Sequence, residues 1–231
     1  MVYSPHPDDE ILGLGATMHY YKRNGFDVLV VLLTHGEKSN ARVKLCDQYN
    51  LCISETEFGL LRVNEFHGAM TSIGVYHVVY DYGDQAIRED SVQDIIQYYD
   101  RQLDIRIHFT TAPEKGHNRD HLILSQALRR CSVRGDKAEF AVYALYRPDV
   151  ETGKGVTVIR ASQDVVAKRD ALYQYRYWNP ARGRYSIGYL SCPEIWNCLY
   201  SKCEYEIIYM IFDEKPWQMT NPIFNHVTYT P

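Results

Sequence analysis

Apolar and polar positions alternate along the chain in a way that predicts strands and helices in turn. A short apolar start at 1–4 precedes a helix whose apolar residues recur at helical spacing up to Asn24. The segment 27–34 (DVLVVLLT) is almost continuously apolar, which is typical of a parallel strand buried on both faces. This strand–helix–strand order predicts a βαβ unit with a right-handed crossover.

The same alternation continues through the next 140 positions. We expect further helices at 54–70, 91–102, 120–130 and 162–175, and strands at 73–80, 105–110, 140–145, 156–159 and 204–212. The pattern weakens beyond Trp178. The chain is therefore predicted to form one domain, 1–231, of the α/β class: a Rossmann-like, doubly wound, mostly parallel sheet in three α/β/α layers. Residues 178–231 are expected to shape the substrate site.

Composition narrows the classes of function. A chain of 231 residues with 45% hydrophobic residues and a net charge of -4 is expected to fold and to have no general attraction for nucleic acid or anionic membranes. The longest purely apolar run, Val28–Leu33, is far shorter than the roughly 20 residues of a membrane span, and no secretory leader is evident. We expect a cytoplasmic protein without a stable membrane anchor, and its six cysteines, which form no CxxC, to be reduced.

The first chemically unusual segment directly follows the first predicted strand. His6, Asp8 and Asp9 stand within four positions, and this crowding of like charges costs free energy unless a cation compensates. Zinc accepts imidazole nitrogen and carboxylate oxygen, so His6 and one aspartate could be ligands while the other aspartate accepts a proton from water. The alternative is a helix N-cap, which explains one aspartate but not both together with the histidine.

A second segment, Gly116–His121, also follows a predicted strand and opens a helix. Two histidines, His117 and His121, and the acid Asp120 lie within five positions there. Ligands of open α/β sheets bind at the carboxyl ends of the strands, where this segment would meet the first one. The two segments together predict a metal site. There is no GxSxG serine motif, and Gly13 and Gly15 lie within a predicted helix and do not form a nucleotide fingerprint.

Taken together, these segments resemble the PIG-L/LmbE-like family of zinc-dependent N-deacetylases. The matching pieces, in the family's order, are Ser4–Glu10 (SPHPDDE), Leu33–Glu37 (LTHGE), the positions Arg62, Glu65, Ala69 and Ile73-Gly74, the looser match Asp84–Ile87 (DQAI), and Gly116–His121 (GHNRDH). The resemblance covers residues 1–130 well and the remainder poorly. It implies hydrolysis of the N-acetyl group of an N-acetylglucosamine-type amino sugar on a larger acceptor, such as an antibiotic intermediate.

The resemblance also implies roles for individual residues. It makes His6, Asp9 and His121 ligands of Zn²⁺, Asp8 the general base, and Arg62 and Asp84 substrate-side residues. It makes His117 the group that stabilises the developing oxyanion or protonates the leaving amine, with Asp120 orienting a histidine. The implied partner is a small-molecule amino-sugar conjugate, and the oligomeric state stays open.

Two features of the sequence depart from the family pattern. The family has His-x-Asp-His, whereas here an extra residue separates His117 from Asp120, so His35 or Tyr146 could take over the role of His117. The strand before the first segment is also short. Two alternatives therefore stay open: a catalytically silent sugar-binding domain on the same fold, and a nucleotide-binding α/β protein with capping aspartates. The tyrosines around Trp178 could stack on sugar rings or simply pack, and Lys168 could bind an acidic carrier group or be solvated.

Overall fold

The computed structural model describes residues 1–112, 118–132, 138–145, 156–159, 161–202 and 205–211. A seven-stranded sheet in the order β3-β2-β1-β4-β5-β9-β6 lies at its centre. The first five of these strands are parallel, and β9 runs antiparallel between β5 and β6. The strands are β1 (Val2–Ser4), β2 (Leu29–Leu32), β3 (Tyr76–Val79), β4 (Ile107–Thr111), β5 (Glu139–Ala144), β6 (Val156–Ile159) and β9 (Tyr205–Met210), with a separate pair of β7 (Trp178–Asn179) and β8 (Arg184–Tyr185).

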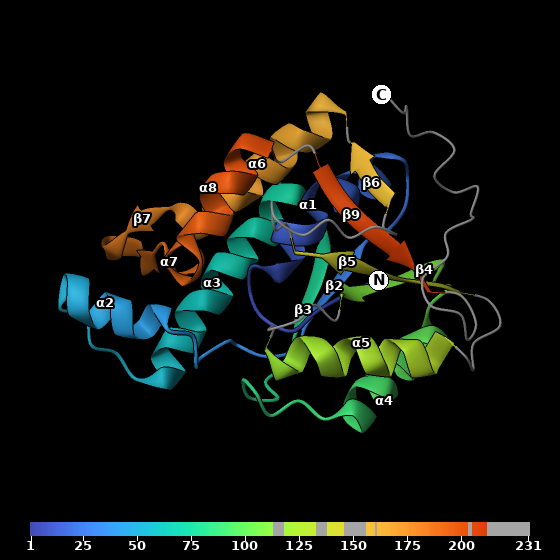
Figure 1. The fold of residues 1–231 in the computed structure, drawn as a ribbon, viewed down its shortest axis with the longest axis horizontal. Coiled ribbons are helices and arrows are strands. Elements are labelled where there is room, and N and C mark those ends of the chain that lie inside the picture. Colours follow the sequence, from blue (N-terminus) through green and yellow to red (C-terminus); the bar gives the residue numbers. More distant parts are fainter. Residues whose placement is uncertain (113–117, 133–137, 146–155, 160, 203–204, 212–231) are drawn as a thin grey trace.

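Helices cover both faces of the sheet (Figure 1). They are α1 (Asp9–Arg23), α2 (Ala41–Tyr49), α3 (Glu55–Ile73), α4 (Glu89–Gln102), α5 (Arg119–Ser132), α6 (Ser162–Arg176), α7 (Ile187–Ser191) and α8 (Pro193–Lys202), with a 3₁₀ turn at Pro180–Arg182. Helices α1, α3 and α6 pack in one layer, and α4 and α5 form the other. The predicted doubly wound, mostly parallel α/β/α fold is confirmed.

The apolar runs form this sheet because alternate residues of each strand face opposite layers. In β2, Val30 and Leu32 join the core under α1, α3 and α6, whereas Val31 joins the core under α4 and α5. A strand with both faces covered needs apolar residues at every position, which is the pattern that 27–34 shows.

The strand order reverses direction between β1 and β4, which are neighbours in the sheet. Such a switch point opens a crevice beyond the carboxyl ends of the two strands. The segment after β1 begins at Pro5, and α5 follows β4, so both chemically unusual segments lead away from this crevice. As expected, β1 is short, yet it pairs on both sides and is fully buried.

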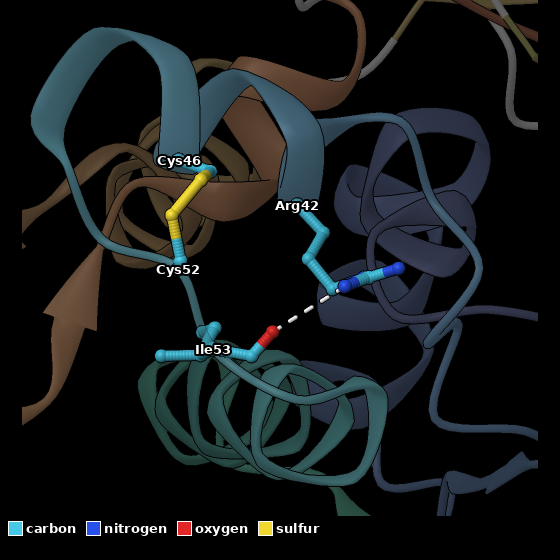
Figure 2. Close-up of a disulfide and its surroundings, with 4 residues drawn as sticks. All are labelled: Arg42, Cys46, Cys52 and Ile53. Carbon is cyan, nitrogen blue, oxygen red and sulfur yellow. Dashed lines mark hydrogen bonds between the residues drawn. A yellow bond between two sulfur atoms is a disulfide. The ribbon is translucent and has the colours of Figure 1, made fainter.

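One expectation about the cysteines is wrong. Cys46 near the end of α2 and Cys52 in the following loop form a disulfide, with Cα atoms 4.4 Å apart (Figure 2). The chain reverses direction between the two cysteines and so brings them together. A search for spacing motifs such as CxxC does not reveal such a pair. Cys192 is a free thiol. Because disulfides persist in oxidising compartments, the cytoplasmic location stays a prediction.

Buried charges also lie against the middle of α1. Lys168 of α6 and Glu206 of β9 are both fully buried and form an ion pair of 2.9 Å. Neither expectation for Lys168, carrier binding or solvation, is therefore correct. A Cβ atom on Gly15 would lie 2.8 Å from the Lys168 side chain, and one on Gly13 would collide with the Tyr143 ring. The two glycines thus allow close packing on α1, which explains a GLG sequence inside a helix.

No helix among the described residues combines the length and the apolar character that crossing a bilayer requires.

Candidate active site

The turn between β1 and α1 carries the first candidate residues. Asp8 occupies the N-cap position of α1, but its side chain makes no capping hydrogen bond. Its φ of 109° lies in a region that residues other than glycine rarely adopt, which is a local strain typical of functional sites. The helix-capping alternative therefore does not account for Asp8.

Three candidate ligand atoms converge where this turn meets α5. His6 Nδ1 and His121 Nε2 lie 3.2 Å apart, and they lie 3.2 and 3.1 Å from Asp9 Oδ2. All three side chains are buried. Ligands of a tetrahedral zinc ion with bonds of about 2.0 Å lie about 3.3 Å from one another. The donor types and their spacing therefore fit zinc, and these are the three ligands that the resemblance implied.

The other nitrogen of His6 faces two further carboxylates. His6 Nε2 lies 3.3 Å from Asp84 Oδ1 and 3.4 Å from Asp120 Oδ2. Histidines that bind metals commonly donate their second N–H to a carboxylate, which fixes the ring orientation. Asp120, which was expected to orient a histidine, therefore lies against His6. Asp120 Oδ1 is buried and has no hydrogen-bond partner among the described residues.

The charges of this cluster are not balanced by its own side chains. Burial opposes a charge on His6, but its hydrogen bonds to Asp120, Asp84 and Asp9 raise its pKa well above the ordinary value. Burial likewise opposes ionisation of Asp9, yet His121 and His6 hold its pKa well below the usual range. The aspartates thus retain negative charge and draw positive charge to the centre of the cluster. A bound cation would supply that charge.

Asp8 points to different partners from those of Asp9. Arg62 Nη2 donates to Asp8 Oδ2 at 3.0 Å and to the Pro7 carbonyl at 2.6 Å, and Nη1 donates to the Gly36 carbonyl at 2.8 Å. Gly36 has a φ of 65°, and a Cβ there would collide with the guanidinium. Burial raises the pKa of Asp8 to about 7, although Arg62 opposes this shift. Asp8 is thus a carboxylate suited to exchanging protons near neutral pH.

A serine that the sequence did not single out completes the surroundings of Asp8. The Ser191 hydroxyl at the end of α7 lies 3.2 Å from Asp8 Oδ2 and 2.6 Å from the Gly188 carbonyl, and its single proton serves one of them at a time. Glu65 of α3 holds α7 in place by accepting hydrogen bonds from the N–H groups of Ile187 and Gly188. Residues beyond 178 therefore reach the site, although their sequence carries no motif.

Glu10 was part of the recognised motif but had no assigned role. It is fully buried and accepts hydrogen bonds from the Tyr175 hydroxyl at 2.6 Å and from the Asp8 N–H at 3.2 Å. Burial raises its pKa to about 8. Glu10 therefore fixes the strained turn at Asp8. Tyr175 belongs to the core, so it is not part of a stacking wall.

Some of the residues that the sequence singled out have surroundings other than those predicted, and others lie outside the described residues. Arg62 and Asp84, expected on the substrate side, are buried and contact Asp8 and His6. Their contact with substrate stays a prediction. His117 and Tyr146 lie outside the described residues. His35 Nδ1 lies 4.0 Å from Asp81 at the carboxyl edge of the sheet.

The chain is similar to a known family over the part that holds most of these residues. A model of the family described as PIG-L: GlcNAc-PI de-N-acetylase matches residues 1–132. A deacetylase of 1D-myo-inositol 2-acetamido-2-deoxy-alpha-D-glucopyranoside from Salinispora arenicola is 37% identical over 70 residues, which are 30% of this chain and 22% of the relative. The match thus spans about a fifth of the length of this curated relative.

Solved structures show the same fold. Teicoplanin deacetylase in its zinc-inhibited form superposes with a TM-score of 0.66 at 16% identity, covering 92% of this chain and 98% of that one. The 4-carboxy-2-hydroxymuconate hydratase of Pseudomonas putida KT2440 superposes with a TM-score of 0.60 at 15% identity, covering 95% and 98%. Because a deacetylase and a hydratase share it, the fold alone does not determine the reaction.

Proposed function

The chain belongs to the PIG-L family, and from that premise we propose that it hydrolyses the N-acetyl group of an N-acetylglucosamine-type amino sugar carried on a larger acceptor. The observation that supports this most directly is the convergence of His6, Asp9 and His121 beside the separately held Asp8. His6, Asp9 and His121 have the donor atoms for a metal. Asp8 is a carboxylate that is not needed as a ligand and can accept a proton. Amide hydrolysis needs both.

His6, Asp9 and His121 would hold Zn²⁺ in this proposal. When bound there, zinc would polarise the amide carbonyl and lower the pKa of water toward about 7. Asp84 and Asp120 would act through His6, because their carboxylates face its second nitrogen and fix the plane of the ring. They would be positioning residues, and a substrate contact is not required of them.

Asp8 would be the general base. As a water molecule attacks the acetyl carbon, its proton passes to the Asp8 carboxylate and a C–O bond forms. Arg62 holds Asp8 Oδ2, so the carboxylate keeps one orientation while it gains and loses the proton. Breaking of the C–N bond then requires a proton on the amine nitrogen, and protonated Asp8 can return the one that it took. His117 is the other candidate donor from the sequence.

The acceptor belongs, in our proposal, to the small-molecule amino-sugar conjugates, with an antibiotic intermediate as one member of that class. The Salinispora arenicola relative is named for an inositol-linked sugar, and a structural neighbour for teicoplanin. The first of these names specifies a 2-acetamido sugar. A cytoplasmic location would suit such a substrate, and we retain it as part of the proposal.

Metal analysis combined with a substrate panel tests this function. Purified protein is expected to contain about one zinc and to release acetate from at least one N-acetylglucosamine conjugate. His121→Gln should lose most of the zinc and the activity, because a catalytic zinc has only three protein ligands. His77→Gln, at a half-buried position of the edge strand β3, is the matched control and should retain both.

The outcomes separate the proposed reaction from its alternatives. Zinc binding and sugar binding without acetate release from any conjugate would favour a catalytically silent sugar-binding domain. Retention of zinc by His121→Gln would overturn the ligand set. A nucleotide-binding protein would keep its stability on treatment with a chelator, whereas a metal held by buried ligands contributes to folding.

A further inference from the structure

A group of tyrosines lies next to the candidate site but takes no part in it. After β3 the chain runs along the carboxyl edge of the sheet, where the N–H groups of Tyr80 and Tyr82 donate to the carbonyls of Leu32 and Leu33 at 2.8 and 3.1 Å. Two positions later Asp84 contacts His6. Two residues of chain span about 7 Å at most, so the backbone of Tyr82 lies that close to the backbone of Asp84.

These tyrosines border a cavity between the strand end and α4. The cavity has a volume of about 300 Å³ and is lined by Tyr80, Tyr82, Ser91, Asp94, Ile95 and Tyr98. We call it the tyrosine subsite. The rings of Tyr80 and Tyr82 stack with centroids 5.8 Å apart and an interplanar angle of 28°. Tyr82 and Tyr98 are 36% and 52% exposed, so their rings are accessible to a ligand.

The lining has the chemistry of a carbohydrate site. Flat aromatic surface packs against the apolar C–H face of a pyranose ring, and phenol, hydroxyl and carboxylate groups bind its hydroxyls. Among the described residues, Asp94 is the charged residue of the lining, which contains neither Lys nor Arg. An anionic group such as a phosphate would be repelled there. The subsite therefore suits an uncharged sugar.

We infer that the tyrosine subsite binds a neutral pyranose ring of the acceptor, adjacent to the acetamido sugar that is hydrolysed. This inference rests on the proposed function for the position of the acetamido sugar, and it narrows the acceptor to one with an uncharged sugar next to the reacting one. Tyr82 and Tyr98 supply the stacking faces, and Asp94 and Ser91 bind hydroxyl groups.

Two variants and a matched control test the subsite. Tyr82→Ala and Tyr98→Ala remove exposed rings, so both should fold, and circular dichroism checks this. Tyr76→Ala removes the most exposed ring of β3, at the opposite end of the strand, and is the control. Binding of N,N'-diacetylchitobiose to each variant is measured by calorimetry in an Asp8→Asn background, which keeps the ligand intact. We expect both subsite variants to bind about tenfold more weakly than the control.

Turnover gives a second, independent measurement. The ratio of kcat/KM for the disaccharide to kcat/KM for N-acetylglucosamine should fall about tenfold in both subsite variants and stay unchanged in Tyr76→Ala. Replacing the second sugar by a phosphate, in N-acetylglucosamine 1-phosphate, should abolish the difference between subsite variants and control.

Failure of the subsite and failure of the proposed function give different results. Acetate release with an unchanged ratio, and unchanged chitobiose binding, would overturn the subsite while the deacetylase function stands. Weakened binding in both subsite variants without acetate release from any substrate would support the subsite while the proposed reaction fails. Absence of chitobiose binding by the parent protein would overturn the subsite.

Discussion

Two groups of buried charges contact the same helix, α1, and they differ in how completely they are satisfied. The first is the site cluster at its N-terminal end, consisting of His6, Asp8, Asp9, Arg62, Asp84, Asp120 and His121. The second is the core ion pair of Lys168 and Glu206 in the middle of the helix. Both are shielded from water, so burial alone does not distinguish a functional site from a structural one.

The core ion pair satisfies its charges within the protein. Glu206 accepts hydrogen bonds from the N–H groups of Ala16 and Thr17, each at 2.8 Å, and Lys168 Nζ donates to the Leu12 carbonyl at 3.1 Å. Leu12 carbonyl and Ala16 N–H would pair with each other in a regular helix, so the two side chains insert into the helical ladder. Cation, anion and backbone groups are matched there, and no ligand is needed.

The charges and polar atoms of the site cluster, in contrast, are not all satisfied within the protein. Buried Asp120 keeps an oxygen that has no hydrogen-bond partner among the described residues, and Asp8 adopts a strained backbone conformation. The buried carboxylates exceed the one permanent cation, Arg62. Buried polar groups that remain unsatisfied cost free energy, and proteins retain them where a ligand or a reaction uses them. The comparison predicts that substitutions in the site cluster affect activity, and substitutions in the core ion pair affect stability.

The largest expected effect is that of Asp8→Asn on turnover. Asparagine has nearly the same shape as aspartate but cannot accept a proton from water, so kcat should fall about 10³-fold. The zinc content should be retained, because Asp8 is not among the three converging ligands. The measurements are acetate release and metal analysis. Full activity in this variant would exclude Asp8 as the base.

Lys168→Met makes the converse test on the core ion pair. Removing the lysine leaves the Glu206 carboxylate buried without its cation, which should lower the free energy of unfolding by about 3–5 kcal/mol. Zinc content and the kcat of the folded fraction should stay unchanged. Urea denaturation measures the stability.

A double variant, Lys168→Met with Glu206→Gln, is the control for this interpretation. It removes both charges, so it should recover part of the stability that the single variant loses. Equal stability of the single variant and the parent protein would contradict the structural role of the pair.

The same contrast explains what could be predicted from the sequence. The sheet and its helices follow from local apolar periodicity, because the central strands β1, β2, β4 and β5 are buried on both faces. Asp9 and His121 could be paired because each lies near the start of the helix that follows a strand, at one edge of the sheet. The contact of Asp8 with Ser191 and the Lys168–Glu206 pair could not be predicted, since they join residues 183 and 38 positions apart and Ser191, Lys168 and Glu206 lie in no motif.

A third buried polar group, His108, makes the stability of the protein depend on pH. Its ring is fully buried, stacked between Tyr3 and Phe140, and burial lowers its pKa to about 4. The unfolded chain binds a proton near pH 6.5, so the stability that neutral His108 contributes is complete above that pH and is lost as the pH falls through 4. The loss amounts to about 3 kcal/mol.

His108→Gln removes the titration and should flatten this part of the pH profile. The quantity to measure is the difference in unfolding free energy between the parent protein and the variant, from pH 7 down to pH 4. A difference that does not change over this range would show that His108 is protonated as easily in the folded protein as in the unfolded chain.

The smallest expected effect concerns Ser191, where the site cluster meets α7. Its hydroxyl shares one proton between Asp8 and the Gly188 carbonyl, and Arg62 also holds Asp8, so Ser191→Ala should lower kcat only about tenfold, with little change in KM. Ser191→Thr should restore most of the rate.

Ser186→Ala is the control, since the Ser186 hydroxyl donates to the Arg176 carbonyl. That variant should lower stability but not kcat. If Ser191→Ala instead lowers the free energy of unfolding and leaves kcat unchanged, Ser191 has a structural role like that of the core ion pair. Arg62 is then sufficient to orient Asp8.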